Sequence, residues 1–393
     1  MKKIVLITLA LIAGVILWLL EPYRYNPFYK PDPPTVKTSI DYHCQTGLEK
    51  ILYRAESVMA QYMLPEDFLG VSAGFYKNGC GSLTAAIGFS DKRNLIEFKP
   101  TTITRIASIT KPMTAIAIMQ LYEAGKVDID ASIQTYLPRF PQGLKTVTIR
   151  HLLSHTSGVG HYKSKLDAMS FSHYDSLKQA TEEIYKRGLL SPAGEQFIYS
   201  SFGYTVLGEV IESVTKQSFE AYLQEYIWQK AGMDNTSLEK SQILQNKSRL
   251  YIKVDDIFVR SPYTDLSLIY PGGGVQSTAQ DLLNFGNAIL ENKLVSKSTL
   301  DMMTDVCNSL APEVGDDPYG LGWSVLEHPE YGKIISHSGA QPGVSGQFLI
   351  FLDKEVVAVA LSNAFGTKNS VRSLALIMGE LGIKAHYESE PRQ

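Results

Sequence analysis

A serine and a lysine three residues apart, Ser108 and Lys111, are the residues whose types and spacing best suit chemistry. They lie where a strand-like run, 101–106, gives way to an apolar segment that predicts a helix ending near Gly125. Side chains with this spacing share one helix face, about one turn apart. A helix N-terminus favours developing negative charge, and a nearby amine can take or relay a proton. The pair could therefore act in acyl transfer, although most isolated Ser-x-x-Lys matches are a helix cap and a solvated lysine.

A second serine lies in the run Gly70–Gly74, which matches the Gly-x-Ser-x-Gly nucleophile elbow of α/β-hydrolases. That motif requires a strand before the serine and a helix after it. Here Asn78-Gly79 separates two strand-like runs, 69–77 and 82–89, and predicts a hairpin instead. Ser72 is therefore expected to be an ordinary strand residue, and the elbow remains an alternative nucleophile.

Two further patterns only partly match the motifs of zinc-binding and phosphate-binding sites. His151 and His155 are four residues apart, but no glutamate between them could serve as the base of a zinc hydrolase. A packing or capping role is expected for both. The run Gly272–Gly274 lacks the lysine and hydroxyl of a phosphate loop, and predicts a tight turn before a capped helix. No metal and no cofactor is predicted.

The elements that position these residues are strands at both ends of the chain and helices in the middle. This arrangement predicts an α+β fold, in which both chain ends build one antiparallel sheet flanked by helices, with a mainly helical lobe inserted between them. The predicted helices are 47–63, 108–125, 149–155, 180–188, 203–215, 218–231, 281–290 and 370–381, and the late strands are 322–326, 333–337, 346–352 and 355–362.

Composition supports one large globular domain. The 393 residues are 44% hydrophobic and 20% charged, enough for a sizeable core. The net charge is −3 and no long basic run is present, which argues against a nucleic-acid partner.

The N-terminus has the pattern of a membrane anchor. Residues 4–20 carry no charge and follow Lys2 and Lys3, and Trp18–Tyr23 is a poor cleavage site. We therefore expect an uncleaved signal anchor, 1–22, with the bulk of the chain on the extracytoplasmic (periplasmic) face of an inner membrane. Secretion after cleavage is the alternative. The expected domains are the anchor, a proline-rich stalk at 23–40, a main globular domain at 41–385 and a polar tail at 386–393.

Cys44, Cys80 and Cys307 are an odd number of cysteines. In an oxidising compartment one pair could form and leave one thiol free, and the sequence does not say which.

Two more motifs follow Ser108-Ile109-Thr110-Lys111 in a fixed order, namely Tyr199-Ser200-Ser201 and His337-Ser338-Gly339. With these three elements the chain resembles the serine β-lactamase-related family of class C β-lactamases and penicillin-binding proteins. The resemblance spans roughly 71–363, and the run 199–205 is similar to the mitochondrial, protease-type branch. Flanking matches are His151–Gly158, Gly272–Gly274 with Ser277-Thr278, and Tyr319–Trp323.

The resemblance implies a role for each motif residue. Ser108 would be the nucleophile, Lys111 its base, and Tyr199 would share a proton with Lys111 and protonate the leaving group. The N–H groups of Ser108 and Ala340 would form the oxyanion hole. His337, where many members have lysine, would meet a substrate carboxylate or tune Tyr199. Ser201, Ser338 and Gly339 would complete the substrate-binding wall.

A lysine acts as a base only if its pKa falls far below about 10.4, through burial or a nearby cation such as His337. Two departures, Ser201 for asparagine and His337 for lysine, favour peptide, amide or ester substrates over β-lactams. We therefore expect a peptidase, amidase or esterase. The alternatives are a true β-lactamase, a D-Ala-D-Ala carboxypeptidase, or a non-catalytic penicillin-binding sensor or scaffold. Oligomerisation is left open.

Overall fold

The computed structural model describes residues 8, 12, 34–44, 48–63, 68–141, 146–164, 171–240, 245–255, 257–306, 310 and 317–387. Nearly all of the predicted anchor, most of the stalk, Cys307 and the last six residues lie outside these ranges. Within them, no helix combines the length and apolar character needed to cross a membrane. The anchor therefore stays a prediction.

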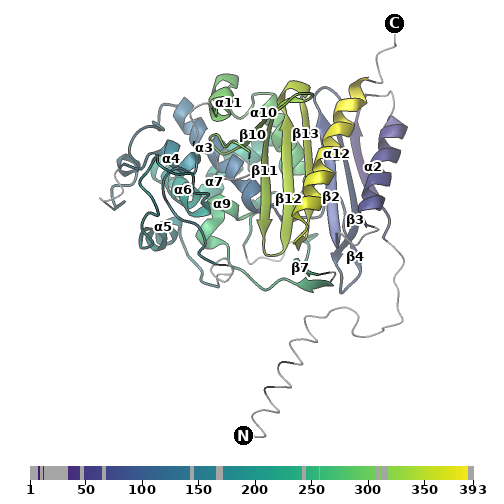
Figure 1. Ribbon diagram of the computed structural model, residues 1–393, viewed down its shortest axis with the longest axis horizontal. Helices are drawn as coiled ribbons and strands as arrows, with labels where there is room; N and C mark the ends of the chain where they lie inside the picture. Colours follow the sequence, from purple (N-terminus) through teal and green to yellow (C-terminus); the bar gives the residue numbers. More distant parts are fainter. Residues whose placement is uncertain are drawn as a thin grey trace.

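Strands from both ends of the chain form the central sheet (Figure 1), in the order β1-β3-β2-β13-β12-β11-β10, with β4 paired to β3. All of these pairings are antiparallel. The α+β fold with an inserted helical lobe is thus confirmed. The strands are β1 (Lys37–Tyr42), β2 (Gly70–Lys77), β3 (Gly81–Asp91), β4 (Ile96–Glu97), β10 (Ser324–His328), β11 (Gly332–Gln341), β12 (Val344–Phe351) and β13 (Val356–Ser362).

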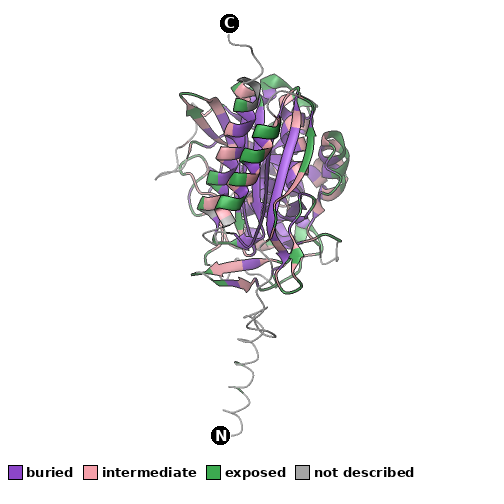
Figure 2. Ribbon diagram, turned by 90° about the vertical axis from the view of Figure 1, so that its right-hand side faces the viewer, coloured by how far each residue is buried: buried purple, intermediate pink, exposed green. Residues whose placement is uncertain are grey.

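Helices cover both faces of this sheet. On one face lie α2 (Leu48–Met63) and α12 (Lys368–Tyr387), and on the other lies α10 (Ala279–Leu290). Residues at helical spacing on α12 are fully buried against the strands, namely Val371, Leu374, Ala375 and Met378. Figure 2 shows exposed residues on the outward side of the helices and mostly buried strands behind them.

The helical lobe lies between β4 and β10 in the sequence and beside the β10–β11 edge of the sheet (Figure 1). Short strands β5 (Thr104–Arg105), β9 (Val275–Ser277) and β6 (Ser237–Leu238) form a small sheet within this part of the chain. Another small sheet joins β7 (Tyr251–Val254) and β8 (Ile257–Arg260) of the lobe to β14 (Ala364–Phe365), which follows β13. The helices of the lobe are α3 (Thr110–Glu123), α4 (Ile149–Leu153), α5 (Leu177–Tyr185), α6 (Ser201–Thr215), α7 (Phe219–Leu223), α8 (Gln229–Ala231), α9 (Tyr270–Gly273) and α11 (Lys297–Met303).

Some element boundaries differ from the prediction because tertiary pairing extends them. Strand β1 begins at Lys37, inside the range expected to be stalk, because Lys37 to Tyr42 pair along β3. The long strand predicted at 101–106 is only β5, because just two of its residues pair with β9. Strand β11 continues past His337 to Gln341, where β12 supplies partners for the whole motif. Helix α12 likewise runs on to Tyr387, into the range expected to be a tail.

Cys44 and Cys80 form a disulfide that the sequence could not assign. It joins the segment after β1 to the turn between β2 and β3, and closes a loop of 36 residues.

Candidate active site

The nucleophile candidate lies on a tight turn between β5 and α3. A single 3₁₀ turn (η1, Ala107–Ile109) holds Ser108, and α3 begins at Thr110. Ala107 adopts a left-handed conformation with φ of 49°, which is rare for a residue with a side chain and marks stored strain. The Thr110 hydroxyl donates to the Ala107 carbonyl at 2.7 Å and supports this turn. Ser108 is half-buried, whereas its neighbours Ala107 and Ile109 are buried.

Strand β11 packs directly against this turn through Gly339. A Cβ at Gly339 would lie 2.2 Å from the Ile106 carbonyl oxygen, so only glycine allows this approach. The next residue, Ala340, is exposed at the same strand position where β11 passes η1. The backbone N–H groups of Ser108 and Ala340 are therefore carried by two segments in close contact, as an oxyanion hole requires.

Lys111 is completely buried on the first turn of α3. Its Nζ donates to Ser108 Oγ at 3.0 Å, to Ser201 Oγ at 2.9 Å and to the Gly272 carbonyl at 2.7 Å. Loss of hydration holds the pKa of Lys111 well below its ordinary value. Burial alone accounts for this shift, so the cationic help expected from His337 is not needed.

Two helices of the lobe supply the partners of Lys111. Ser201 is the first residue of α6, and the Ser200 hydroxyl caps that helix by accepting from the Gly203 N–H at 2.9 Å. Gly272 lies in α9, so close to Ser201 that a Cβ there would be 2.6 Å from the Ser201 carbonyl oxygen. The glycine run that the sequence indicated only as a turn thus brings a carbonyl acceptor to the lysine.

Tyr199 lies next to both members of the pair. Lys111 Nζ is 4.7 Å from the centroid of its ring, and its hydroxyl is close enough to the Ser108 side chain for that side chain to affect the pKa of the phenol. Burial raises the pKa of Tyr199, with the Ser108 contact opposing that shift. The hydroxyl therefore keeps its proton at neutral pH.

His337 is buried on β11, with its ring centroid 6.3 Å from that of Tyr199. Its Nδ1 is 2.7 Å from the Ser338 carbonyl and its Nε2 is 3.0 Å from the Tyr319 hydroxyl. A carbonyl can only accept, so Nδ1 carries a proton, and in the neutral ring Nε2 accepts from Tyr319. Both nitrogens are thus engaged within the protein. Tyr319, which the sequence indicated only as part of a flanking match, fixes the orientation of this ring.

His155, for which the sequence predicted a packing or capping role, packs against residues of the site. It is buried just after α4 with a left-handed φ of 60°. Its Nδ1 accepts from the Ser200 N–H at 3.1 Å, and its ring centroid lies 4.4 Å from that of Tyr199 and 4.7 Å from that of Tyr319. Burial holds the pKa of His155 well below its ordinary value, so the ring is neutral. It therefore supports Tyr199 and the Ser200–Ser201 turn without adding charge.

The other candidates have structural roles. Ser72 is buried in the middle of β2, paired with β3 and β13, and no helix follows it. His151 completes a capping box with Thr148 at the start of α4, as expected. In the described part of the chain, no three His, Cys, Asp or Glu side chains gather as metal ligands do.

Comparisons with known proteins match most of the chain. A family model described as Beta-lactamase matches residues 55–382. The human mitochondrial serine beta-lactamase-like protein LACTB is 27% identical over 408 residues, covering 80% of this chain and 74% of that protein. Penicillin-binding protein 4* of Bacillus subtilis is 29% identical over 295 residues, covering 71% of this chain and 64% of that protein.

Solved structures show the same architecture. The octameric penicillin-binding protein homologue from Pyrococcus abyssi matches with a TM-score of 0.71 and 25% identity, over 84% of this chain and 77% of that chain. The D-amino acid amidase from Ochrobactrum anthropi shares the fold, with a TM-score of 0.75 at 20% identity, over 86% of this chain and 99% of that chain. Since the family model spans nearly the whole described domain, the resemblance seen in the sequence motifs is confirmed, and this chain belongs to the beta-lactamase family.

Proposed function

We propose that the chain is a serine hydrolase that forms an acyl-enzyme on Ser108 and acts on peptide or other amide bonds, with esters as second-choice substrates. The observation that carries this proposal is a lysine with no exposed surface whose Nζ lies 3.0 Å from Ser108 Oγ. A buried, neutral amine beside a hydroxyl is an activated nucleophile pair.

The proposed acylation begins with proton transfer to Lys111. In its neutral form the amine keeps two N–H groups, which satisfy the Gly272 carbonyl and Ser201 Oγ. Its lone pair then faces Ser108 Oγ and accepts the hydroxyl proton as oxygen attacks the substrate carbonyl. No carboxylate is hydrogen bonded to Lys111 Nζ within the described residues, so no opposite charge there offsets the cost of burying the ammonium form.

Tyr199 is the proposed acid for the leaving group. Its raised pKa keeps the phenol protonated, so it can donate to the departing amine or alkoxide and recover a proton through Ser108 or Lys111. The N–H groups of Ser108 and Ala340 would hold the oxyanion, and one such donor is worth about 3–4 kcal/mol of barrier. Water then attacks the acyl-Ser108 ester, releasing the acid and returning the proton to Ser108.

The presence of serine at position 201 supports the proposed ranking of substrate classes. Its hydroxyl accepts from Lys111, whereas the asparagine expected at this position from the family resemblance would add an amide group facing the substrate. Without that amide, and without a lysine at position 337, we rank peptide or amide substrates first, esters second and β-lactams third.

Covalent labelling tests the nucleophile. A fluorophosphonate and a fluorescent penicillin are incubated with wild type, Ser108→Ala and the matched control Ser72→Ala. We expect the control to label like wild type and Ser108→Ala to remain unlabelled. Labelling that persists in Ser108→Ala and disappears in Ser72→Ala would move the nucleophile to β2 and refute the assignment.

A penicillin-binding sensor is the second candidate, because the chain is similar to penicillin-binding protein 4* of Bacillus subtilis. A sensor would form the acyl-enzyme but not release it. Turnover of a chromogenic ester far beyond one equivalent per protein supports the hydrolase, and a burst that stops at one equivalent supports the sensor.

We also propose an extracytoplasmic location, with the chain held by the apolar N-terminal segment. The Cys44–Cys80 disulfide supports an oxidising compartment, because such bonds are rare in the cytosol. Thiol alkylation and mass spectrometry of protein from intact cells test this, since both cysteines would be alkylated in a reducing compartment. Self-assembly is a further proposal, supported by the octameric homologue from Pyrococcus abyssi and checked by light scattering.

A further inference from the structure

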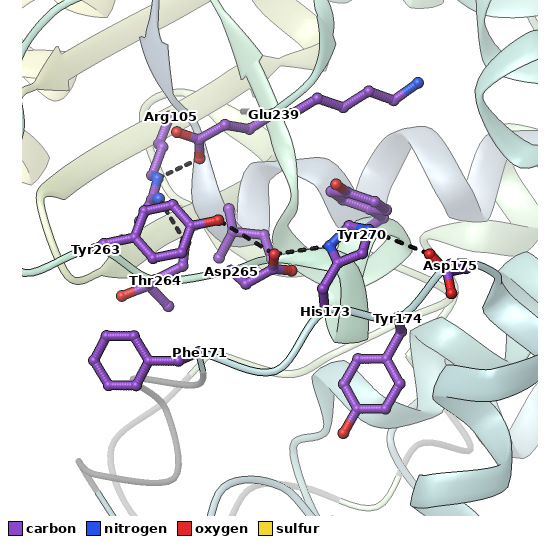
Figure 3. A pocket seen from close by; sticks show the side chains of 12 residues that line it. Arg105, Phe171, His173, Tyr174, Asp175, Glu239, Tyr263, Thr264, Asp265 and Tyr270 are labelled. Atoms are coloured by element: carbon purple, nitrogen blue, oxygen red, sulfur yellow. Dashed lines mark hydrogen bonds and ion pairs between the residues drawn. The ribbon is translucent and has the colours of Figure 1, made fainter. Parts of the chain in front are cut away.

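A pocket of about 600 Å³ lies next to the candidate active site without containing Ser108 (Figure 3). Its volume falls within the range of small-molecule pockets, roughly 300–1,000 Å³. Two of its lining residues connect it to the nucleophile turn. Arg105 lies three residues before Ser108, and Tyr270 lies in α9, two residues before the carbonyl that accepts from Lys111.

The direction of β11 tells on which side of the reacting carbonyl this pocket lies. His337, at one end of the motif, is beside Tyr199, the proposed donor to the leaving group. Past Ala340 the strand reaches Gln341, whose side chain donates to the Gly273 carbonyl at 3.2 Å. Pro342 follows, and its carbonyl accepts from Arg105 in the pocket wall at 3.1 Å. Along this part of the chain, Ala340 thus lies between His337, which is beside Tyr199, and Pro342, which binds the pocket wall. This order favours the acyl side of the substrate as the position of the pocket.

The charged groups of the pocket are already paired with one another or with neighbours. Arg105 is bound to Glu239, which also binds Lys247 at 2.6 Å. His173 lies 2.9 Å from Asp265. Lys240, the one lysine among the described lining residues, is paired with Glu220, which is not part of the lining.

The carboxylate at the centre of Figure 3 has little capacity left for a ligand. Besides His173, Asp265 accepts from the Tyr263 hydroxyl at 3.3 Å and from the Ser267 N–H at 2.8 Å. A ligand charge would therefore have to displace existing partners.

Two aromatic side chains of the lining, by contrast, are largely exposed. The side chains of Phe171 and Tyr263 lie at the same end of the pocket in Figure 3, and they are 70% and 60% exposed. Tyr174 and Tyr270 add two half-buried rings to the lining. Aromatic rings contribute most when they pack on another large apolar or aromatic group.

We infer that this pocket binds the acyl-side residue of the substrate and selects a bulky aromatic side chain there. The inference rests on the proposed function, because it assigns the pocket to the substrate of Ser108. It adds the substrate class, namely amides and esters whose acyl group carries an aryl ring a few bonds from the reacting carbonyl. The ring would pack between Phe171 and Tyr263, and Ser108 would attack the carbonyl beyond it.

The test compares acyl groups on one leaving group. The values of kcat/KM are measured for the p-nitrophenyl esters of acetate, 3-phenylpropanoate and 4-guanidinobutanoate. We expect wild type to prefer the phenylpropanoate over the acetate by about tenfold or more, as one well-filled apolar subsite gives. The double variant Phe171→Ala, Tyr263→Ala should lose most of that ratio.

Tyr53→Ala is the matched control, since Tyr53 is a 73% exposed aromatic on α2, away from the pocket. Its ratio should equal that of wild type. Using a ratio within each variant removes differences in folded fraction.

The outcomes separate the two levels of the proposal. If none of the esters shows turnover that Ser108→Ala abolishes, the hydrolase proposal and this inference both fall. If Ser108 turns over the acetate but the phenyl preference is absent, or survives the double variant, only the pocket assignment falls. A preference for the guanidino ester over the phenyl ester would also overturn it, because the pocket would then recognise charge.

Discussion

Substituting Gly339 by alanine directly tests the contact between β11 and the nucleophile turn. The added Cβ would lie 2.2 Å from the Ile106 carbonyl oxygen, and real Cβ atoms essentially never come closer than 3.0 Å. The strand must therefore retreat by about 0.8 Å from the turn that carries Ser108. Because the neighbour is backbone, no flexible side chain can absorb the clash.

A retreat of this size would separate the two halves of the proposed oxyanion hole. Misplacement by about 1 Å lowers catalysis by roughly 100-fold, so kcat/KM for a chromogenic ester should fall by about that factor. The overpacking should also cost about 1–3 kcal/mol of unfolding free energy. Urea unfolding measures the stability change, and fluorophosphonate labelling rates measure the reactivity of Ser108 independently of the ester.

Gly203→Ala is the control, since its Cβ would meet its nearest neighbour, Leu152, at an ordinary 3.4 Å in α6. It should keep near wild-type activity. The role of this contact is refuted if Gly339→Ala and the control both retain more than about a third of wild-type kcat/KM. In that case β11 would not pack tightly against the nucleophile turn, and Ala340 could not serve as an oxyanion donor.

Three further predictions concern the groups around the nucleophile. Lys111 must be neutral to accept a proton, and its pKa is held well below that of free lysine, so kcat/KM should rise with pH to a plateau well below pH 10.5. Lys111→Arg should abolish activity, because arginine stays charged. An active Lys111→Arg enzyme would exclude lysine as the base. Tyr199→Phe keeps the ring but removes the proton donor, so hydrolysis of anilides should slow by about 100-fold or more, and hydrolysis of p-nitrophenyl esters should slow much less. Equal losses of rate for both substrates would contradict the role of Tyr199 as the acid. His155→Phe removes the acceptor of the Ser200 N–H and should lower the free energy of unfolding by about 1–3 kcal/mol. His155→Asn should recover part of that loss. Urea titrations in which both variants match wild type would show that this hydrogen bond does not support the Ser200–Ser201 turn.

Much of the fold was predictable because its signals are local. Apolar spacing predicted helices that the structure contains, and Asn78-Gly79 predicted the β2–β3 hairpin. Strand lengths were less accessible. The two-residue β5 and the ten-residue β11 differ because of the partner that each finds in the fold, and local sequence does not record that partner.

The candidate site divides in the same way. By itself the sequence determined the chemical types and their order, with a hydroxyl and an amine one turn apart, followed by a tyrosine and then a histidine–serine–glycine run. Only the tertiary structure decided what those groups can do. The partners of Lys111 come from 90 and 161 residues away, and their elements together exclude the water that would keep the amine charged. The engagement of both nitrogens of His337, the support of Tyr199 by His155 and the pocket beyond Arg105 likewise arise from segments that meet only in the folded chain. A pKa depends on solvation and neighbours in space, so the residue type supplies the titratable group and the fold sets its protonation state.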